Sequence, residues 1–354
     1  MRVTRRSFGL LATAAGASLT ADRVSALVAP NTGPSGAPFD PTPYVHPALR
    51  SYVGPMLGAT SADLSDYTLA QARSRPPLLA PLASPTFAER TVPGPRGAPD
   101  VRVYVVNARA NERPRPAILH IHGGGFVMGT ARGWIRCAQD AAVALDCVVV
   151  SVDYRLAPET RFPGSLEDNY AALKWIYANA NALGIDRSRI AVMGESAGGG
   201  HAAMLAIAAR DRGEIPLVYQ ALIYPMLDDR TGSTRKTPPY QGALLWTPGN
   251  NRFGWGSLLG VPAGSPRIPY GSVPARVDNL RGLPPAFIGV GSIDLFVDED
   301  IDYARRLVDA GLPVTLNLVP GAFHGFDLVP SPLAKPFRES VYAALKDAFD
   351  NART

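Results

Sequence analysis

Short apolar runs alternate with longer runs of helical composition along most of this chain. The apolar runs are rich in Val, Ile and Leu, which is typical of strands buried on both faces of a sheet. We therefore expect an α/β fold with a mostly parallel sheet and helices on both faces. The predicted strands are residues 87–92, 101–107, 116–121, 147–152, 189–193, 217–223, 285–291 and 313–319. The predicted helices between and after them are residues 131–145, 165–180, 197–209, 298–310 and 334–349, with Ser165 as the N-cap of the second.

Two segments interrupt this alternation. Residues 44–75 carry apolar residues at helical spacing, so they predict one or two helices before the main domain, joined to it by a Pro-rich connection. Residues 228–282 are rich in Pro, Gly and aromatic residues and show no clear strand pattern. We interpret residues 228–282 as an insertion over a functional site, in a core formed by residues 86–227 and 283–354.

The N-terminal segment has the composition of an export signal. Arg5 and Arg6 precede a modest apolar stretch over residues 9–19, which is much shorter than the ~20 residues that span a bilayer. Small residues at 24–26 offer a cleavage site, with residues 19–21 as a second choice. This pattern predicts a twin-arginine signal over residues 1–26, a linker over residues 27–43 and an exported protein. The alternative is a disordered basic tail on a cytoplasmic protein.

Charge and cysteine content exclude several classes of function. The formal net charge is +5, but residues 1–26 contribute +3 of it, which leaves +2 for the rest of the chain. Nucleic-acid binding is therefore poorly supported. Cys137 and Cys147 lack the spacing of a metal site or of a disulfide framework, and we expect both to be buried free thiols.

The stretch around Ser196 carries the strongest chemical signal. Gly194-Glu195-Ser196-Ala197-Gly198 joins a predicted strand directly to a predicted helix. Such a turn needs strained dihedrals and small flanking residues, and it raises the central side chain above the edge of the sheet. The Ser196 hydroxyl is therefore expected at a helix N-terminus, where a developing anion is stabilised. The pattern predicts a nucleophilic serine.

A serine hydroxyl needs a base, and the base needs an acidic partner. Among the five histidines, His324 follows the last predicted strand in a glycine-flanked loop, at the same sheet edge as Ser196. Asp294 follows the seventh predicted strand and is the expected acid. Asp298 is the alternative, although Asp298 and Glu299 are better placed to cap the next helix. The order Ser, Asp, His along the chain is that of the α/β-hydrolases.

A glycine triplet offers candidate donors for an oxyanion. His122-Gly-Gly-Gly-Phe follows a central strand, and glycines there let backbone amides approach a substrate carbonyl. The expected donors are the amides of Gly124, Gly125 and Ala197. The alternative, a phosphate-binding loop, needs a Lys and a Ser or Thr after the last Gly, and Phe-Val-Met follows instead. We expect His122 to order this loop through hydrogen bonds and His120 to be structural.

With these motifs in order, the sequence resembles the hormone-sensitive-lipase-like family of α/β-hydrolase esterases. The resemblance implies an eight-stranded hydrolase sheet, a cap built from residues 44–85 together with the insertion, no cofactor, and activity on short to medium acyl esters. Two departures are Leu295 where the family usually has Pro, and Glu195 where Asp is commoner. The matching pieces are His120-Ile-His-Gly-Gly-Gly-Phe, Asp153-Tyr-Arg-Leu-Ala-Pro-Glu, Phe162-Pro163 with Glu167-Asp168, Gly194-Glu-Ser-Ala-Gly-Gly, Leu283-Pro-Pro-Ala, Asp294 and His324-Gly-Phe.

The expected activity is that of a serine carboxylic-ester hydrolase that works through an acyl-enzyme. Ser196, His324 and Asp294 are its expected catalytic residues, and its expected partner is a small-molecule ester, with no nucleic acid and no stable membrane insertion. One alternative is the same machinery acting on amides, lactones or carbamates. Another is a non-catalytic ligand receptor, but such relatives typically lose a triad member, and all three are present here.

Overall fold

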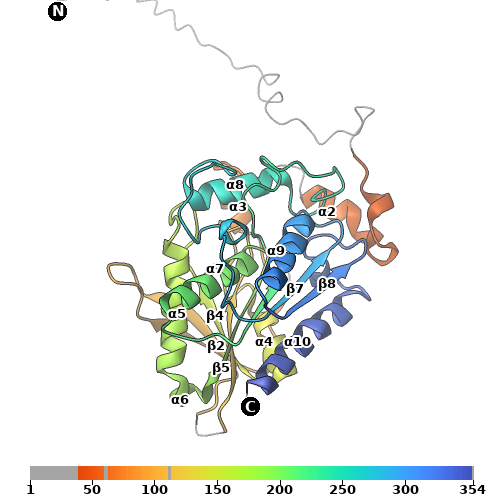
Figure 1. Cartoon of the computed structure of the whole chain (residues 1–354). Helices are drawn as coiled ribbons and strands as arrows, with labels where there is room; N and C mark the ends of the chain where they lie inside the picture. Colours follow the sequence, from red (N-terminus) through yellow and green to blue (C-terminus); the bar gives the residue numbers. More distant parts are fainter. Residues whose placement is uncertain (1–38, 60–62, 78, 111–112, 353–354) are drawn as a thin grey trace, which may run out of the picture. The chain divides into compact units, whose positions relative to one another are not determined.

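Eight strands form a single sheet in the order β1-β2-β4-β3-β5-β6-β7-β8 (Figure 1). The computed structural model describes residues 39–59, 63–77, 79–110 and 113–352. β2 pairs antiparallel with both β1 and β4, and every other pair of neighbours is parallel. The predicted mostly parallel sheet is therefore confirmed. Its strands are β1 (Phe87–Val92), β2 (Val101–Val106), β3 (Arg115–Ile121), β4 (Val148–Asp153), β5 (Ile185–Glu195), β6 (Tyr219–Ile223), β7 (Ala286–Gly291) and β8 (Val314–Val319).

Contacts group Asp40–Thr354 into one compact unit. The predicted export signal over residues 1–26 lies outside the described residues, as do residues 27–38 of the predicted linker over residues 27–43. Both stay predictions. None of the described helices is long and apolar enough to cross a lipid bilayer.

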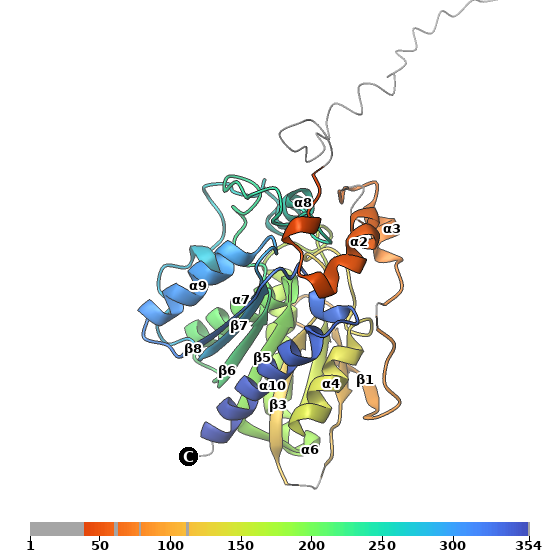
Figure 2. The same cartoon turned by 90° about the vertical axis from the view of Figure 1, so that its right-hand side faces the viewer.

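Helices cover both faces of the sheet. α5, α7 and α9 pack on one face, while α4 and α10 lie side by side on the other (Figure 2). The helices of this core are α4 (Ile135–Leu145), α5 (Gly164–Ala178), α6 (Ala180–Leu183), α7 (Ala197–Arg212), α9 (Val297–Asp309) and α10 (Ala334–Asn351), with a 3-10 turn at η5 (Phe326–Leu328).

The alternation of side chains along β3 shows how the two faces are built. Leu119 and Ile121 belong to the hydrophobic core beneath α5 and α7, whereas Ile118 belongs to the core beneath α4 and α10. All three side chains are fully buried. Apolar side chains that point to both faces of a central strand are typical of a sheet covered on both sides.

Two predictions about helix N-termini are wrong. α4 begins at Ile135 rather than at residue 131, because Ala131 donates its N–H to Asp153 and Gly133 donates to Thr130, which forms a turn. Ser165 is not the cap of α5, since it lies one residue inside the helix and its side chain is buried.

The insertion contains a helix that the sequence pattern did not predict. α8 (Pro248–Leu259) begins after Thr247, whose hydroxyl accepts from the Asn250 N–H, and it ends at Gly260 in the left-handed conformation. A Thr-Pro start and a Gly stop are ordinary helix signals. Three glycines within these twelve residues, at 249, 254 and 256, obscured them. A 3-10 turn, η4 (Pro274–Arg276), follows later in the insertion.

The N-terminal segment of the described unit packs against the insertion and the core. Its elements are short: η2 (Thr42–Tyr44), η3 (Pro47–Tyr52), α2 (Val53–Ala59) and α3 (Leu69–Arg73). The Leu64 N–H donates to Asn250 at 2.7 Å, and Thr247 donates to Asp63 at 2.5 Å, so this segment contacts the start of α8.

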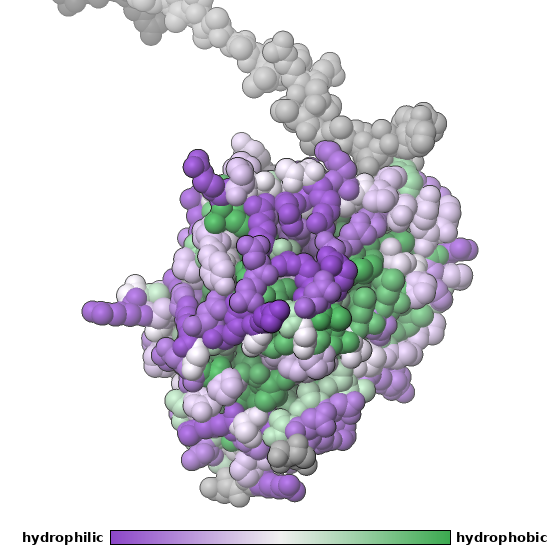
Figure 3. Space-filling view, in the orientation of Figure 1, coloured by the Kyte–Doolittle hydropathy of each residue, from purple (hydrophilic) through white to green (hydrophobic). Residues whose placement is uncertain are grey.

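The edge of the sheet at β8 carries exposed apolar side chains. Leu316 and Leu318 of β8 are about two-fifths exposed, and Ile301 and Val308 of α9 are exposed as well. Figure 3 shows hydrophobic residues gathered around β8, whereas hydrophilic residues dominate the insertion above α9.

Candidate active site

Ser196 lies at the junction between β5 and α7, at the carboxyl end of a central strand. Its backbone is in a strained conformation, with φ 57° and ψ −122°. A methyl group added to Gly194 would overlap with the Gly198 carbonyl, and one added to Gly198 would overlap with the Ile121 carbonyl. The glycines of the Gly-x-Ser-x-Gly motif are thus required by the close approach of three backbone segments.

Three side chains that are far apart in the sequence form a hydrogen-bonded chain. His324 Nε2 lies 2.9 Å from Ser196 Oγ, and His324 Nδ1 lies 2.8 Å from Asp294 Oδ2. Asp294 follows β7 and His324 follows β8, so parallel strands bring all three to one edge of the sheet. Asp294 is fully buried, and its other oxygen accepts from the Phe296 N–H at 3.0 Å. The structure therefore brings Ser196, Asp294 and His324 together.

The alternative acid, Asp298, is not part of this chain. It is exposed in the first turn of α9, where Gln241 donates to it at 3.5 Å. Glu299 is buried instead of capping the helix, because its carboxylate accepts from the N–H groups of Leu227 and Asp228. The N-cap position of α9 is Phe296 and no side chain caps it, so the expectation that Asp298 and Glu299 cap this helix is wrong.

Two aromatic rings enclose the imidazole of His324. Tyr224 and Phe296 both meet it edge to face, with ring centroids 4.8 and 5.2 Å away. The Tyr224 hydroxyl donates to Asp327 at 2.9 Å. Burial raises the pKa of Asp327 to about 6, and the bond from Tyr224 opposes that rise. Nothing in the sequence pattern marks Tyr224, the residue after β6, as a neighbour of His324.

The glycine triplet forms a tight loop beside Ser196. Gly124, Gly125 and Phe126 all have positive φ, and the Gly124 carbonyl accepts from the N–H groups of Val127 and Met128. Within the described part of the chain, no acceptor takes the N–H groups of Gly124, Gly125 or Ala197. These three amides are therefore available to bind an oxygen that carries developing negative charge.

The loop is held from beneath by a stacked pair of rings. His122 stacks on Tyr154 at a centroid distance of 4.3 Å, and the Tyr154 hydroxyl donates to the His122 carbonyl at 2.9 Å. His122 Nδ1 lies 2.8 Å from the Gly123 carbonyl, as expected for a residue that orders the loop. Burial lowers the pKa of His122 to about 4, so its imidazole is neutral near pH 7.

The Asp-Tyr-Arg-Leu-Ala-Pro-Glu motif after β4 fastens the same loop. The Ala157 N–H donates to the Phe126 carbonyl at 3.0 Å, and Arg155 forms a bidentate pair with the buried Asp168. Arg73 of α3 donates to the Val127 carbonyl at 2.8 Å and pairs with Glu159. The motif thus contributes to the site by positioning the glycine-rich loop at residues 122–126, which we call the oxyanion loop.

His120 lies on β3, two residues before the loop, and has structural partners on both sides. Its Nδ1 is 2.8 Å from Ser151 Oγ, and its Nε2 is 2.9 Å from Glu195 Oε2. All three side chains are buried. These contacts agree with the expected structural role of His120 and give Glu195 a partner that the sequence did not predict.

The remaining histidines and the cysteines lie outside this chain of contacts. His201 is buried on α7 between the rings of Phe126 and Tyr154, and burial lowers its pKa to about 3. Both cysteines are free, but Cys137 is half-buried and only Cys147 is buried, which corrects the expectation for Cys137. Among the described residues, no group of three or more His, Cys, Asp or Glu is arranged to hold a metal ion.

Known proteins are similar to this chain in sequence and in architecture. A family described as alpha/beta hydrolase fold matches residues 118–328, which is more than half of the chain. Carboxylesterase NlhH of Mycobacterium tuberculosis is 35% identical over 296 residues, covering 83% of this chain and 91% of that protein. Esterase LipI of the same organism is 36% identical, covering 66% of this chain and 73% of that protein. A solved structure of a bacterial heroin esterase matches with a TM-score of 0.78 and 35% identity, covering 88% of this chain and 99% of that chain.

The family match and the site geometry agree on the same segments. The matched range includes the oxyanion loop, the serine turn, Asp294 and His324. The relatives extend the similarity over most of the chain, and their identity exceeds the level at which only a fold is shared. The chain therefore belongs to the α/β-hydrolase fold family and is one of its hormone-sensitive-lipase-like carboxylesterases.

Proposed function

We propose that this carboxylesterase cleaves short to medium acyl esters through an acyl-enzyme formed on Ser196. The observation that carries the proposal is the continuous hydrogen-bonded chain from Asp294 through His324 to the Ser196 hydroxyl. A serine activated by an adjacent base is the arrangement that acyl transfer requires.

In the first half of the reaction, Ser196 Oγ attacks the carbonyl carbon of the ester. His324 Nε2 takes the hydroxyl proton. Asp294 accepts a hydrogen bond from His324 Nδ1–H and stabilises the imidazolium. The carbonyl oxygen becomes an oxyanion, which accepts from the N–H groups of Gly124, Gly125 and Ala197. Each such donor typically contributes ~10²–10³ in rate. When the tetrahedral intermediate collapses, His324 returns the proton to the departing alkoxide, and the alcohol leaves.

In the second half, a water molecule attacks the acyl carbon. His324 takes a proton from this water, and the same three amides bind the second oxyanion. Collapse breaks the bond to Ser196 Oγ, His324 protonates that oxygen, and the carboxylic acid is released. The enzyme returns to its starting protonation state.

The range of substrates is proposed from the surroundings of the site. Ser196 and His324 are each only about 5% exposed, and Leu245 and Trp246 of the insertion contact the loops beside them. Burial of the reacting side chains under apolar residues favours a small acyl group. The related carboxylesterase NlhH and the heroin esterase support an ester as the substrate. Amides, lactones and carbamates use the same chemistry, so a substrate panel has to contain one of each.

The direct experiment replaces Ser196 with Ala and measures hydrolysis of p-nitrophenyl butyrate. We expect nearly complete loss of activity, together with loss of covalent labelling by a fluorophosphonate probe. A matched control is Ser188→Ala, which alters an exposed serine at the start of β5. An unchanged rate in Ser196→Ala would end the proposal.

Residues 1–26 are proposed to direct export through a twin-arginine route. The basis is the pair Arg5-Arg6 ahead of a short apolar stretch and a small-residue cleavage site. The test fuses residues 1–43 to a reporter enzyme in a bacterium with a twin-arginine pathway, beside a variant with Arg5→Lys and Arg6→Lys. We expect export of the first fusion and retention of the second, and equal retention of both contradicts the proposal.

A further inference from the structure

The insertion places a strained turn against two loops of the proposed active site. The Trp246 N–H donates to the Leu244 carbonyl at 2.8 Å, which closes a γ-turn, and Leu245 at its centre has φ 64°. A γ-turn with positive φ is rare and strained. Such strain persists where the surrounding contacts enforce it, and it clusters at functional sites.

Two side chains of this turn, Leu245 and Trp246, contact two different loops of the site. A methyl group added to Gly325, the residue after His324, would lie 2.9 Å from Leu245 Cδ2. A methyl group added to Gly125 would overlap with the six-membered ring of Trp246. Leu245 therefore contacts the loop of the proposed base, and Trp246 lies against a proposed oxyanion donor.

The Trp246 ring is fixed by a buried amide. Its Nε1 donates to Asn251 Oδ1 at 3.3 Å, and Asn251 Nδ2 donates to the Thr231 carbonyl at 2.8 Å. Asn251 is fully buried on α8, and Trp246 is only 4% exposed. The Thr231 carbonyl accepts from the amide nitrogen of Asn251. The amide oxygen of Asn251 therefore faces the indole.

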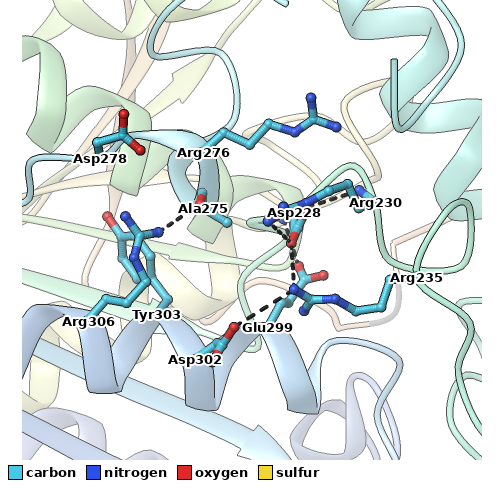
Figure 4. Close-up of a pocket in the computed structure, with 10 residues that line it drawn as sticks. All are labelled: Asp228, Arg230, Arg235, Ala275, Arg276, Asp278, Glu299, Asp302, Tyr303 and Arg306. Carbon is cyan, nitrogen blue, oxygen red and sulfur yellow. Dashed lines mark hydrogen bonds and ion pairs between the residues drawn. The ribbon is translucent and has the colours of Figure 1, made fainter. Parts of the chain in front are cut away.

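An ion-pair cluster anchors the segment that carries Thr231. Arg230 and Arg235 both pair with the buried carboxylate of Asp228, and Arg235 also approaches Asp302 of α9 (Figure 4). This cluster lines a polar pocket of about 360 Å³, in which Figure 4 shows Glu299 of α9 below Asp228. The start of the insertion is thereby tied to α9, the helix that follows Asp294.

The position of Trp246 relates it to one part of an ester. In the proposed tetrahedral intermediate the leaving oxygen faces His324, because His324 protonates it. The oxyanion faces the amides of Gly124 and Gly125, and the acyl group is the remaining substituent of the same carbon. The Trp246 ring packs on Gly125, so we take it as the boundary of the space on the acyl side. A long acyl chain on that side meets the indole ring.

We infer that Trp246 is a specificity-determining residue that restricts this enzyme to esters of short acyl groups, and that Asn251 is a positioning residue for its indole. The inference rests on the proposed function, since it assigns the acyl side from the role of His324. In Trp246→Ala the space of the indole becomes available to a longer chain, and in Asn251→Ala the ring loses the bond that holds it.

The test measures kcat/KM for p-nitrophenyl acetate, butyrate and octanoate with the full chain. In Trp246→Ala we expect the octanoate-to-acetate ratio to rise by about 10- to 100-fold, the range that a few methylene contacts give in an apolar pocket. In Asn251→Ala we expect a smaller rise in the same direction, which a general loss of stability does not produce. Trp246→Leu is measured in parallel, because it keeps an apolar side chain and protects the test against misfolding.

The control is Trp175→Ala, which removes a half-buried tryptophan of α5 far along the chain from the insertion. An unchanged ratio in both Trp246 variants overturns the inference, as does an equal rise in the control. Fluorophosphonate labelling of each variant separates this failure from failure of the proposed function. If Ser196 is labelled and the ratio is constant, only the inference about Trp246 falls.

Discussion

Glu195 Oε2 lies 2.9 Å from His120 Nε2, and this contact joins the residue before the proposed nucleophile to the strand before the oxyanion loop. His120 is in turn bonded to Ser151 on the neighbouring strand β4. A buried bond between β5 and β3 fixes the distance between Ser196 and the amides of Gly124 and Gly125. Glu195, which departs from the commoner Asp, thus has a role in positioning.

Removing the Glu195 carboxylate should therefore cost both stability and activity. In Glu195→Ala the buried His120 Nε2 loses its partner, and we expect the free energy of unfolding to fall by about 1–3 kcal/mol. We also expect kcat to fall more than KM changes. Glu195→Gln is the matched control, since its amide can still bond to His120. Chemical denaturation and ester kinetics check both variants, and full stability of Glu195→Ala would show that the contact contributes nothing.

The two candidate acids can be separated by a pair of conservative variants. Asp294→Asn keeps the shape of the side chain but removes the charge facing His324, and we expect kcat to fall by ~10⁴, as in other triads. Asp298→Asn alters an exposed residue and should change kcat by less than about twofold, in line with other surface changes. Steady-state kinetics on one ester decide the matter. A large loss only in Asp298→Asn would reassign the acid.

The turn at residues 194–198, which carries Ser196, should not tolerate a side chain at Gly198. A Cβ there would lie 2.0 Å from the Ile121 carbonyl oxygen on the adjacent strand, so one of the two backbone segments would have to shift. We expect Gly198→Ala to lower the free energy of unfolding by about 3 kcal/mol, the upper end for overpacking. Gly54→Ala is the control, because no atom lies within 4 Å of the added methyl group and helix α2 should gain up to about 1 kcal/mol. Equal effects of the two changes would contradict this account.

His201 should make the protein less stable in acid. Burial lowers its pKa to about 3 in the folded state, against an ordinary value of 6.5. Between pH 6.5 and 3 the unfolded chain therefore binds a proton that the folded chain does not, so stability falls as the pH falls. From pH 6.5 to 4.5 this amounts to about 2–3 kcal/mol.

The measurement compares the pH dependence of unfolding in the wild type and in His201→Phe, with His201→Leu as a second variant. Phe suits the site because Phe126 and Tyr154 already surround the ring. Asp327, whose pKa burial raises to about 6, contributes with the opposite sign, but it is common to all three proteins and cancels in the difference. Parallel pH curves for wild type and variants would refute the assignment.

Local sequence was sufficient for the elements whose signals are local. The strand pattern, the glycines around Ser196 and the glycine triplet at 123–125 each follow from what a few neighbouring residues can and cannot adopt. The order of Ser196, Asp294 and His324 after parallel strands was enough to predict that they meet at one edge of the sheet. Helix α8 has local capping signals, but its three interior glycines oppose a helix in the sequence pattern. In the folded protein, packing on the core outweighs the low helix propensity of these glycines.

What the amino-acid sequence by itself determined is the sheet, the turn that carries the nucleophile and the identity of the three residues that meet. Tertiary structure excluded the alternative acid Asp298, and it alone decided that Glu195 bonds to His120 and that Trp246 lies on Gly125. The physical reason is distance along the chain. Residues separated by 75 or more positions leave no periodic trace of their contact, because that contact depends on how whole elements pack against one another.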